Sequence, residues 1–453
     1  MILMEKAGIP SVTFTARHFI HDARSTADVL GCPEVPLALF PEVLTNQTSE
    51  SLARMVAGVV DQVIDGLTKQ PTPMGEFRPR LSETEVITGD DYGDCLANFN
   101  RLFVEREWSD GFPLIPPTPK AVERMIAGYK LPPEAVVVNG LYPGRGVASI
   151  EKIAINGVMA GCHPEHMPVL VALAKAYEGL GVIGKMQAMS TGPNAPLVLI
   201  SGPIIEKLGF NYRTCVMGPG SPSHVNTVIG RALRLMLMNI GQCYPGSMDM
   251  DTLGTPNKYS FCLAENVARN PWEPWNVQQG FDREVSTLSI TCVYPGPDVY
   301  DFTATKPEEM LDTLITLTGS YIGVISVGRW FYGGRPDPDK PQETHKEIHM
   351  LILAPTHADL MRKHGWTKAD IQEYLHQKSR IPFKRLYTIA VKPIEKALKA
   401  TRPELMWLLD QPDTMISMAE GPECYEVFVT GGDAGRSQFL YGGSDVSTVA
   451  IDI

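Results

Sequence analysis

The sequence predicts an α/β protein that begins with half of a domain. Apolar, β-branched segments alternate with helical segments along the chain. Several of these apolar segments end at a glycine, as strands do in open α/β sheets. The first seventy residues contain only two strand patterns, too few for a sheet of their own. We therefore expect one half of a doubly wound, flavodoxin-like domain at the N-terminus, and then a large mixed α/β domain.

The composition is typical of a cytoplasmic protein. The chain has 453 residues, a length that allows roughly two to four domains. It carries 40 Lys and Arg against 51 Asp and Glu, and this net charge of −11 argues against a general nucleic-acid binder. No apolar run reaches the roughly 18 residues that a membrane span requires, and the start has no secretory signal. The eight cysteines are scattered without a CxxC, a pattern typical of reduced thiols. We expect a cytoplasmic location, without nucleic-acid or membrane partners.

The order of elements near the N-terminus indicates the half-domain. A helix tail ends at Gly8, and the segments Ile9–Thr15 and Val35–Phe40 have the composition of strands. Helical periodicity marks Ala16–Leu30 and Ser49–Leu67. Two parallel strands with their helices cannot cover both faces of a sheet. The segment therefore looks like the second half of a domain whose first half lies elsewhere.

A resemblance supports this interpretation. The stretches Glu5–Thr15, Ala23-Arg24 and Gly31–Pro41 resemble the C-terminal half of the UGSC-motif family, small α/β proteins named for a selenocysteine- or cysteine-Gly-Ser-Cys motif. No Gly-Ser-Cys triplet occurs in this chain, so the family's reactive residue has no counterpart here. The resemblance implies a second polypeptide that holds the first half of the domain and its cysteine, in a hetero-oligomer. The alternative is a start assigned downstream of the true one, or a truncated chain.

The rest of the chain is expected to form one large region. Residues 1–69 are the half-domain, the polar residues 70–92 read as a linker, and residues 93–453 form an α/β region that is catalytic or binds substrate. This region also resembles uncharacterised bacterial proteins associated with UGSC-like domains, and that resemblance implies no activity. The matching stretches are Ser109–Thr118, Ala154–Glu165, Thr252–Gly254 and Gly431–Gly435.

Cys162 is the cysteine with the most informative surroundings. A helical pattern over Ile150–Ala160 ends at Gly161, and Pro164 is typical of a second helix start. A thiol just ahead of a helix N-terminus feels its partial positive charge, which stabilises the thiolate. His163 and His166 flank it as candidate bases or proton carriers. The alternatives are a buried structural cysteine or a metal site, although no second ligand cluster accompanies it.

A glycine-rich turn precedes the helix expected over Val225–Ile240. Glycines allow backbone N–H groups to approach a ligand, and a helix N-terminus favours an anion. The spacing is neither a Walker A nor a GxGxxG motif, so no nucleotide is indicated. A substrate carboxylate or phosphate is one interpretation, and an ordinary loop with paired arginines is the other. The predicted substrate-binding residues are Gly218, Gly220, Ser221, His224 and Arg231.

Four apolar segments each run into a turn and provide further candidates. They are Leu197–Pro203, Ile322–Gly328, Met350–His357 and Val427–Gly435. Ligands of open α/β sheets bind beyond the carboxyl ends of strands, although a polar residue there is often only a helix cap. The residues that follow from this rule are Ser201, Arg329, His357 and Asp433.

Two stretches rich in proline and tryptophan hold candidate carboxylates. Asp110 and Glu273 lie within them, and Glu265 lies nearby. Burial against tryptophan would favour the protonated acid and suit Asp110 or Glu265 to acid–base catalysis, whereas surface packing is the simpler interpretation. His345 and His349 have HxxxH spacing, but the segment alternates as a strand does, so we predict no metal site.

Together these patterns predict a subunit of a thiol-dependent enzyme that acts on a small anionic organic substrate. The resemblance to the UGSC-motif family, in which selenocysteine can stand in place of cysteine, implies thiol redox chemistry or cleavage of a carbon–heteroatom bond, as an oxidoreductase or lyase. The thiol would be that of Cys162 or of the partner. One alternative is a cysteine-independent lyase or hydrolase that uses Asp110, Glu265 and a histidine. Another is a non-catalytic scaffold that completes a partner's active site. The sequence identifies neither the substrate nor a cofactor.

Overall fold

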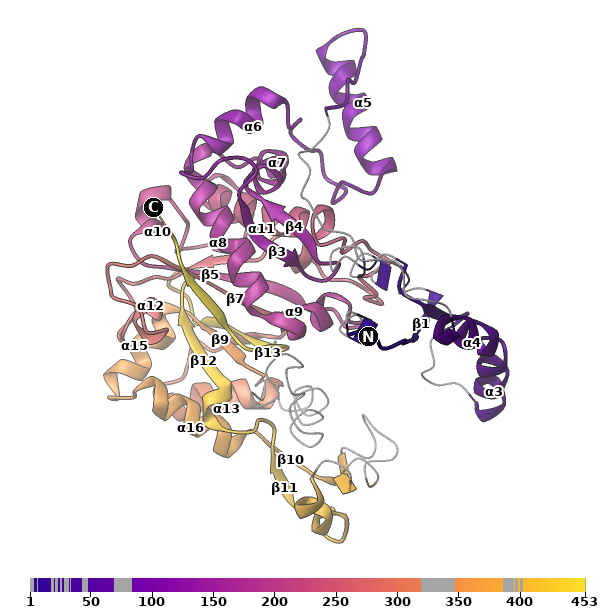
Figure 1. The fold of residues 1–453 in the computed structure, drawn as a ribbon. Coiled ribbons are helices and arrows are strands. Elements are labelled where there is room, and N and C mark those ends of the chain that lie inside the picture. Colours follow the sequence, from indigo (N-terminus) through magenta and orange to yellow (C-terminus); the bar gives the residue numbers. More distant parts are fainter. Residues whose placement is uncertain are drawn as a thin grey trace. The chain divides into compact units, whose positions relative to one another are not determined.

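A computed structural model describes residues 48–68, 84–318, 347–385 and 402–452 without interruption, and parts of 4–42 and 395–399 (Figure 1). The chain divides into two compact units. The first comprises Met1–Glu178, Ala188–Gly192 and Ala232–Leu253. The second comprises Gly179–Gln187, Pro193–Arg231 and Gly254–Ile453.

The chain up to Gly179 contains two pairs of strands, each followed by helices. In chain order they are β1 (Thr13–Ala16), β2 (Leu37–Phe40), α3 (Ser49–Ala57), α4 (Val60–Thr68), α5 (Tyr92–Glu105), α6 (Pro119–Ile126), β3 (Val136–Leu141), β4 (Gly146–Ser149), α7 (Ile150–Ala160), η2 (Pro164–His166) and α8 (Met167–Gly179).

The remaining elements build most of the second unit. They are α9 (Gly181–Ala188), β5 (Ala195–Ser201), α10 (Ile204–Leu208), η3 (Ser221–Ser223), α11 (His224–Asn239), η4 (Pro256–Lys258), β6 (Cys262–Ala264), α12 (Trp275–Gln278), β7 (Thr287–Tyr294), β8 (Asp298–Tyr300), α13 (Pro307–Thr318), β9 (His349–Leu353), α15 (Pro355–Lys363), α16 (Lys368–Lys378), β10 (Arg380–Pro382), η5 (Pro403–Leu409), β11 (Met415–Ser417), η6 (Pro422–Cys424), β12 (Tyr425–Val429), β13 (Arg436–Gly442) and β14 (Ser447–Ala450).

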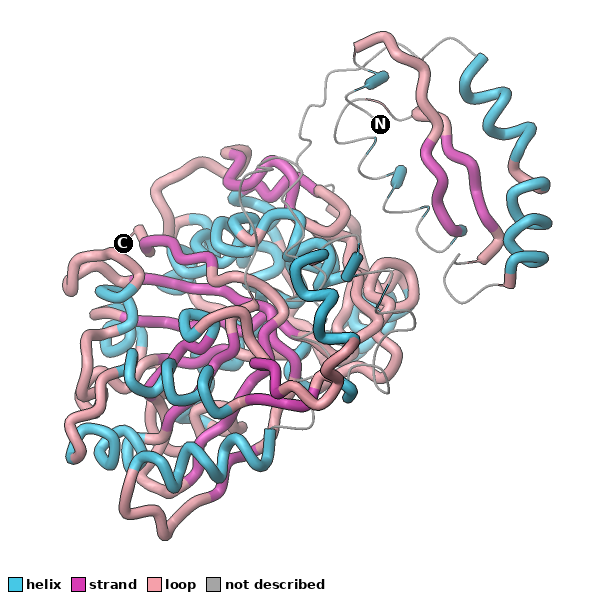
Figure 2. Tube along the Cα trace, turned by 90° about the horizontal axis from the view of Figure 1, so that it is seen from below, coloured by secondary structure: helices cyan, strands magenta, loops and turns pink. Residues whose placement is uncertain are grey.

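The N-terminal segment contains the two parallel strands that the sequence predicts. β1 pairs with β2 in parallel, and α3 and α4 lie along the strand pair (Figure 2). Both strands begin later than predicted. The paired region starts at Thr13 and Leu37, directly after Pro36, which has no N–H to donate to a neighbouring strand. The single helix expected over Ser49–Leu67 is interrupted at Gly58, a residue that weakens a helix interior. Most of the expected helix Ala16–Leu30 lies outside the described residues.

In the rest of the first unit, β3 and β4 form an antiparallel hairpin that leads into α7. Ser149 caps α7 by accepting a hydrogen bond from the N–H of Lys152, and Gly161 ends the helix with a φ of 95°. This helix has the predicted bounds. α5 begins within the segment that the sequence indicated as linker, because Asp91 caps its N-terminus.

The second unit is organised by an eight-stranded mixed sheet. Its order is β12-β9-β13-β7-β5-β6, with β14 paired to β7 and β8 paired to β13. β5 pairs with β6 in parallel and β12 pairs with β9 in parallel, whereas the other pairs in this sheet are antiparallel. The prediction of an α/β protein is therefore confirmed, and its large region is of the mixed kind. The flavodoxin-like arrangement of the N-terminal segment stays a prediction.

The two edge strands of this sheet meet at their carboxyl ends. The N–H of Asn266, which follows β6, donates to the carbonyl of Val429 at the end of β12, at 2.9 Å. Thr430 Oγ1 donates to the carbonyl of Ala264 at 2.6 Å. Residues that follow β6 and residues that follow β12 are therefore neighbours, although about 160 positions separate them in the sequence.

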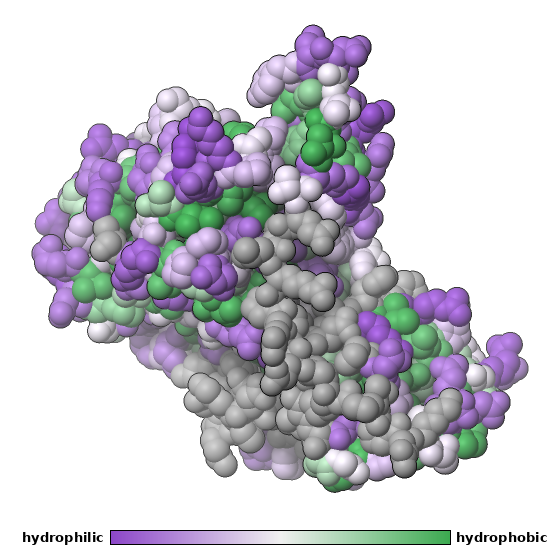
Figure 3. All heavy atoms as spheres, turned by 45° about the horizontal axis from the view of Figure 1, so that its top comes forward, coloured by the Kyte–Doolittle hydropathy of each residue, from purple (hydrophilic) through white to green (hydrophobic). Residues whose placement is uncertain are grey.

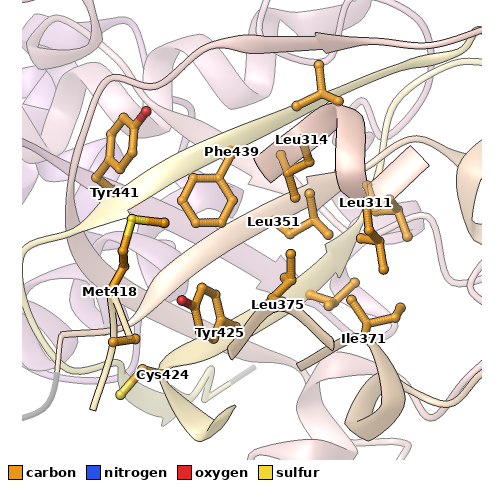
Figure 4. Packing of buried hydrophobic residues seen from close by; sticks show 14 of the residues in the cluster. Leu311, Leu314, Leu351, Ile371, Leu375, Met418, Cys424, Tyr425, Phe439 and Tyr441 are labelled. Atoms are coloured by element: carbon orange, nitrogen blue, oxygen red, sulfur yellow. The ribbon is translucent and has the colours of Figure 1, made fainter. Parts of the chain in front are cut away.

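A hydrophobic core covers each face of the sheet. Side chains alternate along β9, so that Leu351 and Leu353 join one core and Met350 and Ile352 join the other. The first core includes residues of α13, α15 and α16, and Figure 4 shows part of it around Phe439. No single helix among the described residues has the length and apolar composition of a membrane span, although the adjacent pair Pro164–Gly179 and Gly181–Ala188 passes that test when taken together.

Candidate acid–base site

Ser201 and Glu265 come together because they end two parallel strands. β5 and β6 are paired in register from Val198 and Cys262 onward, which brings the next residues of both strands side by side. The N–H of Glu265 continues this ladder by donating to the carbonyl of Ile200 at 2.9 Å. The predicted residues Ser201 and Glu265 are therefore neighbours at the carboxyl end of the strand pair, where ligands of α/β sheets bind.

Glu265 accepts hydrogen bonds from three groups around its carboxylate. Ser201 Oγ donates to Oε2 at 2.5 Å, and Asn270 Nδ2 donates to Oε1 at 2.7 Å. The backbone N–H of Trp275 lies 3.0 Å from each oxygen. Glu265 is 1% exposed, and a buried carboxylate is tolerated only when donors or cations surround it. Its position is therefore fixed by the first turn of α12 and by the end of β5.

Buried partners also hold the residues next to Glu265 in place. The indole Nε1 of Trp275 donates to Ser289 Oγ at 2.8 Å, and its ring lies edge-on to Phe428 at 5.7 Å. Asn276 Nδ2 donates to three backbone carbonyls, the nearest being that of Val285 at 2.8 Å. Both Trp275 and Asn276 are fully buried. The support around Glu265 is therefore rigid.

Lys368 reaches the same place from helix α16. It is the first residue of that helix, which Thr367 caps together with Asp370. Its Nζ donates to the carbonyl of Val427 on edge strand β12 at 2.8 Å. The same ammonium lies 5.9 Å from the ring centres of Trp272 and Trp275. Lys368 is therefore half-buried between an edge-strand carbonyl and two aromatic faces.

Burial moves the pKa values of Lys368 and Glu426 toward each other. Burial lowers the pKa of Lys368 to about 8, although the charges of Glu265, Glu426 and Glu273 oppose this change. Burial also raises the pKa of Glu426, and the charge of Lys368 opposes that change. The result is an amine that is partly neutral near neutral pH, close to a carboxyl group that binds a proton more readily than usual. Such opposed changes are typical of acid–base pairs.

The predicted residues His357 and Asp433 have partners within the second unit. His357 is 3% exposed, and its two ring nitrogens lie 2.8 Å from Ser437 Oγ and 2.9 Å from the carbonyl of Asp301. Burial lowers the pKa of this histidine. Asp433 is exposed and forms an ion pair with Arg269 at 2.8 Å. Their roles in substrate binding stay predictions.

The glycine-rich turn leads into a helix, as predicted. Gly220 has a φ of 112°, η3 follows it, and α11 begins at His224, one residue earlier than expected. Ser223 Oγ accepts a hydrogen bond from Asn211 Nδ2 at 2.8 Å, which ties this turn to the preceding loop. The five predicted residues all belong to the second unit, and their role in binding an anion stays a prediction: Gly218, Gly220, Ser221, His224 and Arg231.

Cys162 has the helix-terminus surroundings that the sequence predicts. It lies between Gly161, the cap of α7, and His163, which precedes η2 and α8. The N–H of His163 donates to Nδ1 of His166 at 3.0 Å, and the two rings stack at 5.6 Å. Cys162 is 8% exposed. These three residues and Asp110 belong to the first unit, whereas Glu265 belongs to the second.

The remaining candidates are ordinary in their contacts or lie outside the described residues. Asp110 is half-buried and accepts a hydrogen bond from the N–H of Phe112 at 3.2 Å. Arg329 and His345 lie outside the described residues. His349 is the first residue of β9, in agreement with the predicted strand. Within the described part of the chain, no three His, Cys, Asp or Glu side chains are grouped as metal ligands.

The sequence offered weak signals for the two residues that were missed. Lys368 follows Thr367 in a Thr-x-x-Asp capping box, so it had the appearance of an ordinary first-turn residue. Glu426 is a single charge inside the otherwise apolar strand β12. A charge in such a strand is costly unless it has a partner, and that cost was the one available indication of a site.

Comparison with known proteins assigns the N-terminal segment. Residues 1–69 match the model of the UGSC family, so the resemblance seen in Glu5–Thr15 and Gly31–Pro41 is confirmed and this segment is a UGSC-family segment. No curated protein and no solved structure matches the chain. The correspondence to the C-terminal half of the family, and the resemblance noted for residues 93–453, stay predictions.

Proposed function

We propose that this chain is a lyase or hydrolase that works by acid–base catalysis on a small organic substrate, without a catalytic cysteine. Lys368 accepts the proton, Glu426 donates one, and Glu265 is the positioning residue. The observation that carries the proposal is the position of Lys368, whose Nζ donates to the carbonyl of Val427 at 2.8 Å and lies 5.9 Å from the ring centre of Trp275, the residue whose N–H binds Glu265. Burial at this position lowers the pKa of Lys368 to about 8 and raises the pKa of Glu426. This function develops the cysteine-independent alternative that the sequence left open, with a lysine in place of the histidine.

The proton transfers balance within this pair. The neutral amine of Lys368 takes a proton from a substrate carbon or from an attacking water, and becomes an ammonium ion. The reactive form of the pair is the one in which Glu426 carries a proton, which it gives to the leaving group to become a carboxylate. The pair then has the opposite protonation, and exchange with water restores it. General acid–base catalysis of this kind typically contributes about 10²- to 10⁴-fold to a rate.

A structural role for Lys368 is the competing explanation. Its hydrogen bond to Val427, and that of Gln372 to the carbonyl of Tyr425 at 2.6 Å, cover the edge of β12. Two substitutions of Lys368 distinguish the structural role from the catalytic role. Lys368→Arg keeps a donor for the edge carbonyl but cannot lose its proton near neutral pH, whereas Lys368→Met removes both properties.

The test combines a direct titration with a substrate panel. Nuclear magnetic resonance of the chain carrying ¹³Cε-labelled lysine, with Lys368→Met to identify the signal, is expected to show a midpoint near 8. A panel of hydroxy acids and p-nitrophenyl esters is expected to show turnover that survives treatment with iodoacetamide. Lys368→Arg is expected to lower this turnover at least about 100-fold while the melting temperature stays the same. A midpoint above 10, or full activity in Lys368→Arg, would rule out the proposed role.

Thiol chemistry is a second proposed function, favoured by the position of Cys162 between a helix cap and a new helix N-terminus. In that reaction the thiol of Cys162, or of a partner, acts on a small anionic substrate by redox chemistry or carbon–heteroatom cleavage. Iodoacetamide treatment would then abolish turnover, and Cys162→Ser would abolish it if the thiol is that of Cys162 but not if it is the partner's. Lys368→Arg would leave it unchanged, so the same panel distinguishes the two functions.

A further inference from the structure

The N-terminal segment exposes an apolar stripe on one side of helices α3 and α4. Met55 and Val59 face the strands and are buried. One position further round, residues spaced three or four apart form a second stripe that is about half exposed. Its members and their exposed fractions are Val56 (51%), Val60 (43%), Ile64 (54%) and Leu67 (47%). Figure 3, in which α3 and α4 lie at the right, shows apolar residues at this surface.

The stripe points toward the β1 side of the strand pair. Gln62 lies on the opposite flank of α4, where its Oε1 accepts a hydrogen bond from the N–H of Leu39 at 2.9 Å. In the parallel ladder, this N–H points away from β1, so Gln62 marks the outer edge of β2. Val60 and Ile64 therefore face the opposite way, over β1 and beyond it.

Phe14 of β1 adds to the same surface. It is in register with Ala38 of β2, so both side chains point to the face that α3 and α4 cover. Ala38 is fully buried by these helices, whereas Phe14 is 55% exposed and touches only the ring of Phe40 at 5.6 Å among described aromatic partners. Among the described strands, β1 pairs with β2 alone. An open strand edge, an exposed phenylalanine and an apolar helix flank thus adjoin one another.

The spacing of strands and helices decides what fits this surface. Neighbouring strands lie about 4.8 Å apart, so a strand added beside β1 is about 10 Å from β2, the strand that α3 and α4 cover. A helix over that added strand would be at the usual packing distance of about 8–10 Å from α3 and α4. A second copy joined through β1 would instead place its own helices over a strand about 14 Å away, which is too far for the two stripes to touch.

We propose that this surface, formed by Phe14, Val56, Val60, Ile64 and Leu67, docks a strand and a helix from a second polypeptide. The strand pairs with the open edge of β1, and the apolar face of the helix packs against the stripe on α3 and α4. The surface lies outside the acid–base site, so this interaction stands independently of the reaction proposed above.

Photo-cross-linking of the full chain in the organism that encodes it tests the proposal. p-Benzoylphenylalanine replaces Ile64 in the stripe, or Asp65 on the solvent side of the same helix as a matched control. We expect the Ile64 position to form an adduct with a different polypeptide, at a residue in a helix adjacent to a strand, and the Asp65 position to form none. Addition of Val60→Asp is expected to lower the adduct at least tenfold without a change in the melting temperature, because Val60 is exposed in the free segment.

Three outcomes would overturn the proposal. An Ile64 adduct with a second copy of this chain would show self-association, and an adduct within one chain would show that the surface is covered internally. The absence of any adduct, or equal adducts at Ile64 and Asp65, would show that the stripe has no partner. Lys368→Met leaves this surface intact, so a failure of the proposed reaction would not change these results.

Discussion

The N-terminal segment and the eight-stranded sheet both pack helices against strands, but the N-terminal segment buries a smaller share of its large apolar residues. In the N-terminal segment, a core of Ala38, Phe40, Met55 and Val59 lies on one side of β2, while Phe14 stays exposed. In the second unit, a core covers each face of the sheet. The alternation of strand and helix patterns in the sequence therefore indicates the class of fold, whereas the number of strands decides whether a segment can bury its apolar side chains.

The same difference separates two kinds of functional surface. In the second unit, apolar burial is complete enough to hold a carboxylate at low solvent exposure, as it does for Glu265. In the N-terminal segment, incomplete burial leaves an apolar surface that suits a protein partner. We therefore expect catalysis in the second unit and binding of a protein partner at the N-terminal segment.

The largest expected effect contrasts one aromatic residue from each region. Trp275→Ala is expected to lower the free energy of unfolding of the second unit by about 3–5 kcal/mol, because it removes a fully buried ring and its hydrogen bond to Ser289. Phe14→Ala is expected to change the stability of its own segment by less than about 0.5 kcal/mol, because the ring is largely exposed. Hydrogen exchange of peptides from β7 and β1 in increasing urea measures the two effects separately.

Equal losses in the two variants would contradict the comparison. A large loss in Phe14→Ala would mean that β1 is packed against something in the isolated chain. A small loss in Trp275→Ala would mean that the core around Phe428 repacks without the indole.

How far the sequence predicts these features depends on how local each one is. The bounds of α7 and its end at Gly161 were predicted correctly, because caps and helix periodicity are set by adjacent residues. The end of β5 at Ser201 was also predicted correctly, from an apolar run that ends at a glycine. The approach of Lys368 to Glu265 was missed, because it depends on the strand order that brings the ends of β6 and β12 together. The spacing of residues in the sequence does not reveal that strand order.

An intermediate effect is expected from His349, a fully buried residue of the sheet. Burial lowers its pKa to about 4 from 6.5, so the unfolded chain binds a proton over this range while the folded chain does not. Stability is therefore expected to fall as the pH decreases from 6.5 to 4, by about 3 kcal/mol at about 1.4 kcal/mol per pKa unit. Urea unfolding at a series of pH values measures this slope, and His349→Gln is expected to remove it.

The control for this slope is a glutamine substitution at His364, which is exposed and lies outside the sheet. His349→Gln also keeps an acceptor for the N–H of Gly442, which donates to Nδ1 at 2.9 Å in the native chain. A slope that persists in His349→Gln would assign the acid sensitivity to carboxylates instead.

The smallest expected effect is the pH dependence of stability that Lys368 causes. As with His349, stability increases with pH, but over a higher pH range. Its folded pKa of about 8 lies below the ordinary value of 10.5, so the unfolded chain binds the extra proton between these values. Stability is therefore expected to rise as the pH increases from about 8 to 10.5, by only about 1–2 kcal/mol because water partly screens the half-buried ammonium. Hydrogen exchange of the β12 peptide at these pH values measures the rise, and Lys368→Arg is expected to abolish it. A flat profile in the native chain would mean that the ammonium is hydrated as in an ordinary surface lysine, and would remove the physical basis for its role as a base.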